Sequence, residues 1–137
     1  MTSSVLALPA VVRARIELLR AKARDGMSVT CGGVSMEPAI RRGDAVRIEA
    51  GELRRGVVAA FVTRSGVLEL HRLVARAPGL AWWVHAGDNQ AAPALGLVHR
   101  DQIIGVATTP VRAPSMRTRA RAMTRLARAA LRRTFAR

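Results

Sequence analysis

The feature that most constrains the fold is a series of short strand-type segments, separated by turn residues, through the middle of the chain. Each segment either alternates apolar and polar side chains or forms a short apolar run, and glycine, proline, serine and aspartate gather between the segments. The predicted strands are residues 27–31, 44–50, 56–63, 67–77, 80–86 and 102–108. Several short strands joined by tight turns predict a mainly β domain, built on a curved antiparallel sheet or a partial barrel.

A helix is predicted before the strands, over residues 10–24. Pro9 suits a position in the first helical turn, and Gly26 can end the helix in a left-handed conformation. Apolar residues recur between them at three- or four-residue spacing, at Val12, Ile16, Leu19 and Ala23. The chain therefore divides into an N-terminal helical segment (1–26), a β domain (27–112) and a C-terminal tail (113–137).

The tail carries much of the excess positive charge. The whole chain has 23 basic and 9 acidic residues, a net charge of +14, and the tail alone contains eight arginines and no acid. Its apolar residues can share one helical face: Met116, Ala120, Met123, Ala127, Ala130 and Leu131. This pattern predicts a basic amphipathic helix, with a simply solvated helix as the alternative. The expected partner is an anionic membrane surface, and nucleic acid is the less favoured one.

Cysteine content and hydropathy bear on the compartment. Cys31 is the single cysteine, which rules out an internal disulfide and suits a reducing environment. No segment reaches the roughly 20 apolar residues of a spanning helix. We therefore expect a cytoplasmic protein, with peripheral membrane association through the tail. The three histidines lack metal-site spacing, so no metal or other cofactor is expected, and His85 and His99 are expected to be strand or surface residues.

One serine has a sequence context that suits nucleophilic chemistry. Ser35 follows the glycine pair Gly32-Gly33 and precedes a short segment that ends at Pro38. A turn of this kind can direct the hydroxyl away from the fold and leave backbone N–H groups free to bind an oxyanion. The motif is not the G-x-S-x-G elbow of α/β-hydrolases, because Glu37 stands where the second glycine would be.

Further motifs follow Gly33-x-Ser35-Met36-x-Pro38 in a defined order: Arg42-Gly43-Asp44-Ala45-Val46, Arg55-Gly56-Val57-Val58-Ala59-Ala60-Phe61, His71-Arg72-Leu73-Val74, Gly87-Asp88-Asn89 and Ile103-Ile104-Gly105-Val106. In this order, residues 29–106 resemble the superfamily of type I signal peptidases and LexA-like serine peptidases. The resemblance implies a serine endopeptidase that processes a peptide or protein precursor. It assigns the nucleophile to Ser35 and the oxyanion and substrate-binding segment to Gly33, Val34 and Met36.

The resemblance places the general base at His71, where bacterial relatives have a lysine. Lys22 is the only lysine and lies in the predicted helix, so a Ser–Lys dyad is excluded by composition. Histidine in this place is similar to the endoplasmic-reticulum and archaeal signal peptidases. An imidazole with a pKa of about 6.5 is mostly neutral near pH 7 and can accept the serine proton without prior burial.

The third member of the site is left open by the sequence. Asp88 is the leading residue to orient His71, as the resemblance implies an important acid there. The relatives carry a further acidic pair where this chain has Pro93 and Ala94, so Asp101 or Glu69 could serve instead, or no acid at all. A site without its orienting acid suggests a second hypothesis, in which a weak or inactive relative acts as a binding or regulatory module with a cationic tail for membrane or nucleic acid.

Overall fold

One α-helix and seven strands make up the part of the chain that the structure, a computed structural model, describes: residues 7–77, 81–89, 94–108 and 124. In chain order the elements are α1 (Ala10–Arg24), β1 (Met27–Thr30), β2 (Ala45–Glu49), β3 (Val58–Val62), β4 (Leu68–Arg76), β5 (Trp82–Ala86), β6 (Leu95–His99), the 3₁₀ helix η1 (Arg100–Gln102) and β7 (Ile103–Ala107). The predicted tail helix lies outside the described residues. No helix within them is long and apolar enough to cross a bilayer.

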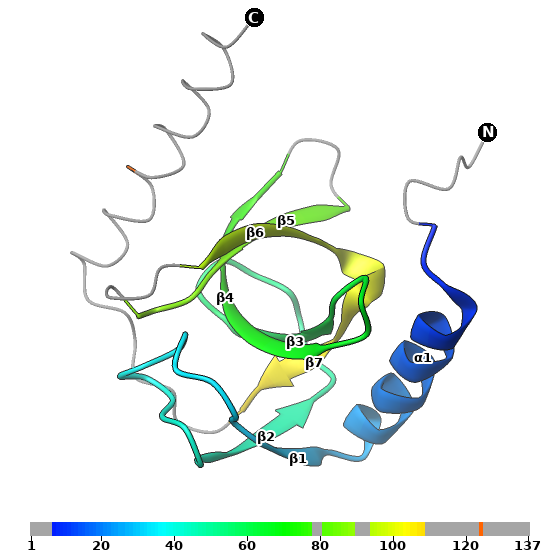
Figure 1. The fold of residues 1–137 in the computed structure, drawn as a ribbon, viewed down its shortest axis with the longest axis horizontal. Coiled ribbons are helices and arrows are strands. Elements are labelled where there is room, and N and C mark those ends of the chain that lie inside the picture. The colour runs from blue at the N-terminus through cyan, green and yellow to red at the C-terminus, as the bar shows by residue number, and fades with distance from the viewer. Residues whose placement is uncertain (1–6, 78–80, 90–93, 109–123, 125–137) are drawn as a thin grey trace, which may run out of the picture.

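The seven strands form a single antiparallel sheet in the order β1-β2-β7-β3-β4-β5-β6. Figure 1 shows the sheet curving strongly around itself, with α1 outside it. The sheet stays open, because β1 and β6 are its two ends and do not pair with each other. The prediction of a mainly β, curved antiparallel sheet is confirmed. The sequence pattern missed β6, where Gly96 weakens the strand signal.

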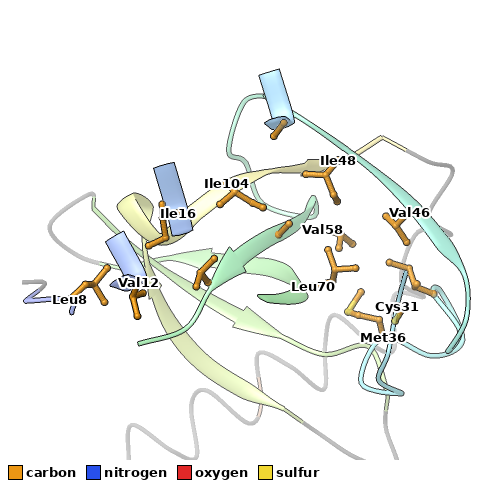
Figure 2. Close-up of a cluster of buried hydrophobic side chains, with 14 residues drawn as sticks. Leu8, Val12, Ile16, Cys31, Met36, Val46, Ile48, Val58, Leu70 and Ile104 are labelled. Carbon is orange, nitrogen blue, oxygen red and sulfur yellow. The ribbon is translucent and has the colours of Figure 1, made fainter. Parts of the chain in front are cut away.

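The sheet separates two clusters of buried side chains. Because successive side chains of a strand point to opposite faces, the fully buried strand β3 contributes Val58, Ala60 and Val62 to one cluster and Ala59 and Phe61 to the other. Figure 2 shows the first cluster, which also contains Val12, Ile16, Met36, Ile48, Leu70 and Ile104. The second cluster contains Leu73, Trp83, Val98 and Ile103 as well. The candidate site lies where β4 passes between these clusters.

The helix α1 covers part of the first cluster. Its predicted ends are confirmed: it follows Pro9, and Gly26, at a φ of 84°, lies just beyond its last turn. The helix packs mainly against β7, and the Arg20 guanidinium donates hydrogen bonds to the carbonyl oxygens of Asp101 (2.8 Å) and Ile103 (3.1 Å). The N-terminal helical segment therefore shares its core with the sheet.

Candidate active site

Ser35 lies in a turn that joins β1 to β2 and is anchored by its neighbour. The Glu37 N–H donates to the Val34 carbonyl (3.1 Å), and the Ile40 N–H donates to the Met36 carbonyl (2.9 Å). The Met36 side chain is only 1% exposed and packs in the first cluster, whereas Val34 remains partly exposed. Burial of Met36 therefore fixes the turn against the sheet, while Ser35 remains half-buried beside it. This position indicates a packing role for Met36 and not a chemical one.

The structure brings Ser35 and His71 together from segments 36 residues apart. His71 lies in the middle of β4, and its Nε2 is 3.0 Å from the Ser35 Oγ. Burial lowers the pKa of His71 below its ordinary 6.5, and the nearby Glu69 and Asp88 carboxylates partly offset this effect. His71 is therefore mostly neutral near pH 7, the form in which an imidazole can take a proton from a serine hydroxyl.

The backbone N–H groups at Ser35 and Met36 differ in exposure, since Ser35 is half-buried and Met36 is only 1% exposed. Among the described residues, no acceptor takes up the N–H of Ser35 or of Met36. A side chain added at Gly32 or Gly33 would meet no atom within 4 Å, so the chain leading to Ser35 borders open space. This arrangement suits the binding of a carbonyl oxygen whose carbon lies next to the Ser35 Oγ.

Asp88, the leading residue predicted to orient His71, pairs in the structure with Arg72. Its carboxylate accepts three hydrogen bonds from the Arg72 guanidinium: from Nε to Oδ1 (2.9 Å) and to Oδ2 (3.3 Å), and from Nη2 to Oδ2 (2.6 Å). Both side chains are buried. Arg72 follows His71 in β4, so the two side chains point to opposite faces of the sheet. Asp88 therefore neutralises a buried arginine and makes no hydrogen bond with the His71 ring.

The loop that contains Asp88 contacts the backbone of the Ser35 turn. The Asn89 N–H donates to the Ser35 carbonyl (2.9 Å), and its side-chain amide donates to the Val34 carbonyl (2.8 Å). Gly87 packs so closely that a Cβ at this position would lie 2.5 Å from the Ser35 carbonyl oxygen. The Gly87-Asp88-Asn89 motif thus positions the Ser35 backbone, while the Arg72–Asp88 pair holds the loop on the sheet.

His85 occupies the place expected for an orienting acid. Its Nδ1 is 2.9 Å from the Nδ1 of His71, and its side chain is 8% exposed. Of the two acids that could have replaced Asp88, Glu69 lies beside the base, with its Oε2 4.0 Å from the His71 Nδ1, whereas the exposed Asp101 pairs with His99. The sequence pattern placed His85 on a strand but gave no sign of its contact with His71.

A one-residue shift between β4 and β5 explains why the sequence did not reveal this contact. Arg76 pairs with Trp83 and Ala75 with Val84, a register that would set His85 opposite Val74. A bulge between Leu73 and Ala75 instead sets His85 opposite Leu73, on the face that carries His71. The sequence predicted that the two strands are adjacent, but adjacency fixes neither the pairing register nor the face on which His85 lies.

Two further observations bear on what the site can hold and on what the chain resembles. In the described ranges, no group of three or more His, Cys, Asp and Glu side chains is arranged to bind a metal ion. The Ser35 hydroxyl meets the His71 imidazole, which in turn meets the His85 imidazole, an arrangement that suits attack on a carbonyl carbon. Comparisons of the chain with family models, curated proteins and solved structures find no match.

Proposed function

We propose that the protein is a serine endopeptidase in which Ser35 is the nucleophile and His71 the general base. The observation that carries this proposal is the 3.0 Å separation of Ser35 Oγ and His71 Nε2, between a surface turn and a buried strand. The free backbone N–H groups beside Ser35 and the clamp from Asn89 support it. Together with the motif order, the curved sheet favours a fold of the signal peptidase-like type.

The proposed reaction uses one proton twice. As the Ser35 Oγ bonds to the scissile carbonyl carbon, its O–H bond breaks and the proton moves to the His71 Nε2. The carbonyl oxygen becomes an oxyanion, and the backbone N–H of Ser35 is the donor proposed to bind it. The His71 imidazolium then gives the proton to the leaving amine, and water hydrolyses the acyl-enzyme with His71 again as base.

The substrate proposed is an extended segment of a peptide or protein precursor. β1 is an end strand of the sheet, and the chain continues from it through the open Gly32-Gly33 stretch to Ser35. A peptide that adds to this edge would gain backbone hydrogen bonds and run towards the nucleophile. The resemblance favours small residues beside the cleaved bond. The cationic tail would bring the enzyme to an anionic membrane surface from the cytoplasm.

A fluorophosphonate that labels activated serines tests the proposal without knowledge of the substrate. We expect an adduct on Ser35 by mass spectrometry, absent in Ser35→Ala and reduced in His71→Gln by about 10⁴-fold. The matched control is Ser28→Ala, which removes an exposed serine in β1. Its labelling rate should equal that of the wild type.

The same experiment separates the second hypothesis from the first. If wild type and Ser35→Ala react equally slowly, the peptidase proposal is wrong, and a binding module with a cationic tail becomes the better explanation. If the wild type does react faster than Ser35→Ala, digestion of candidate precursors by the wild type but not by Ser35→Ala would identify the substrate class.

A further inference from the structure

Two histidine rings form a buried pair behind Ser35. His71 in β4 and His85 in β5 lie on the same face of neighbouring strands, with their ring centres 4.9 Å apart. Phe61 packs against both rings, with centroid separations of 5.9 Å and 4.7 Å. On the other side Gly96 makes room for His85, because a Cβ there would lie 2.8 Å from the His85 Nε2. The pair is therefore held in one arrangement by packing.

The geometry of this pair allows one shared proton. The two Nδ1 atoms are 2.9 Å apart, so one of them donates and the other accepts. If His85 donates, the neutral His71 carries its own proton on Nε2 and cannot accept one from Ser35. If His71 donates, its Nε2 is unprotonated and faces the Ser35 Oγ at 3.0 Å. Only the second arrangement makes His71 a base.

The charges around the pair favour the productive arrangement. The Glu69 carboxylate lies 4.0 Å from the His71 Nδ1 and attracts a proton to that nitrogen. Burial and the neighbouring His71 lower the pKa of His85 to about 4, so His85 is neutral near pH 7 and has one nitrogen free to accept. His85 Nδ1 thus receives the hydrogen bond that carboxylates receive in Ser-His-Asp triads.

We propose that His85 is the positioning residue of the site: it accepts the Nδ1–H of His71 and holds His71 in the tautomer that can deprotonate Ser35. The proposal rests on the peptidase function proposed above. His85 neither gains nor loses a proton in the reaction. The positive charge that His71 gains is partly offset by Glu69 and, to a lesser extent, by Asp88. The two tasks of a triad carboxylate, orientation and charge compensation, are therefore divided between His85 and these carboxylates.

Nitrogen NMR of the histidine side chains tests the tautomer directly. In the wild type near pH 7.5, we expect His71 to be protonated on Nδ1 and unprotonated on Nε2. His85→Leu removes the acceptor and should shift His71 towards the Nε2–H tautomer. His85→Asn can place an acceptor near the former Nδ1 and should restore the wild-type tautomer. The matched control is His99→Asn, which replaces a buried histidine in β6 and should leave His71 unchanged.

Fluorophosphonate labelling of the same variants links the tautomer to reactivity. We expect His85→Leu to reduce the labelling rate of Ser35 at least about tenfold, with the 10⁴-fold loss of a triad acid as an upper limit. His85→Asn should recover most of that rate. A wild-type His71 in the Nε2–H tautomer would overturn the proposal, as would a greater loss from Glu69→Gln than from His85→Leu. If His85→Leu does not fold, the His71 tautomer in the wild type and in His85→Asn still tests whether His85 positions His71.

The two proposals fail in different ways. If the tautomer responds to His85 as expected but wild-type Ser35 does not react, the peptidase function is wrong and the positioning of His71 stands. If Ser35 reacts but the His71 tautomer is the same in wild type and His85→Leu, the peptidase function stands and the role of His85 is wrong.

Discussion

His71 and His85 meet through their Nδ1 atoms, 2.9 Å apart, across the β4–β5 pairing. A carboxylate in the place of His85 would orient the base and also raise its pKa. A neutral imidazole orients the base without adding charge, so the pKa of His71 is left to burial and to the more distant Glu69 and Asp88. The pKa of His71 in this pair therefore determines how the reactivity of Ser35 should depend on pH.

The reactivity of Ser35 should extend to mildly acidic pH. Because burial lowers the pKa of His71, the acid limb of the labelling rate should have its midpoint below pH 6.5. Glu69→Gln removes a charge that favours the imidazolium, so it should move this midpoint to still lower pH. Asp88→Asn should move it less, because Asp88 raises the pKa less than Glu69 does. A midpoint above 6.5 in the wild type would contradict the expectation.

Asp88 should matter more for stability than for the tautomer of His71. Asp88→Ala leaves Arg72 buried without its carboxylate, which should reduce the free energy of unfolding by about 3 to 5 kcal/mol in urea denaturation. The double variant Arg72→Met with Asp88→Leu should be much closer to the wild type. A stable Asp88→Ala protein with an altered His71 tautomer would instead support a triad role for Asp88.

Gly87→Ala should displace the nucleophile. The added Cβ would lie 2.5 Å from the Ser35 carbonyl oxygen, so the turn must move. A shift of about 1 Å can reduce a rate by about 10²-fold, and we expect a loss of labelling on that order. Gly32→Ala is the matched control, because its Cβ would meet nothing within 4 Å. Equal labelling of the two variants would show that this close approach does not position Ser35.

The histidine pair should make stability depend on pH in a defined window. The pKa of His85 is about 4 in the folded protein and near 6.5 in the unfolded chain, so the unfolded chain binds more protons between these values. Stability is therefore complete above pH 6.5 and falls as the pH drops towards 4, by about 3 kcal/mol from His85. Urea denaturation across this range should show a smaller fall for His85→Asn.

The tail, by its sequence, should bind anionic membranes. Deletion of residues 117–137 removes eight arginines and no acid. Flotation with vesicles that contain phosphatidylserine should show weaker binding of the shortened chain, and salt should weaken binding of the full chain. Neutral phosphatidylcholine vesicles are the control. Binding that neither the deletion nor salt changes would contradict this role.

Much of the fold follows from local patterns in the sequence. Pro9 and Gly26 mark the ends of α1, and the apolar runs and turn residues mark six of the seven strands. The seventh, β6, has too weak a pattern to be found in this way. The motif order predicted Ser35 and His71 as a pair, and the structure places the Ser35 Oγ and the His71 Nε2 at hydrogen-bond distance.

The partners of His71 depended on the tertiary structure. Strand alternation turns Arg72, and Asp88 with it, away from the His71 ring, and the bulge in β4 turns His85 towards it. Both outcomes depend on a single-residue register, which is set by how the whole curved sheet packs around its two clusters. The sequence by itself determined which residues could act as a nucleophile or a base. Only the folded sheet decided which acceptor meets His71, because a register shift of one residue moves every side chain of a strand to the opposite face of the sheet.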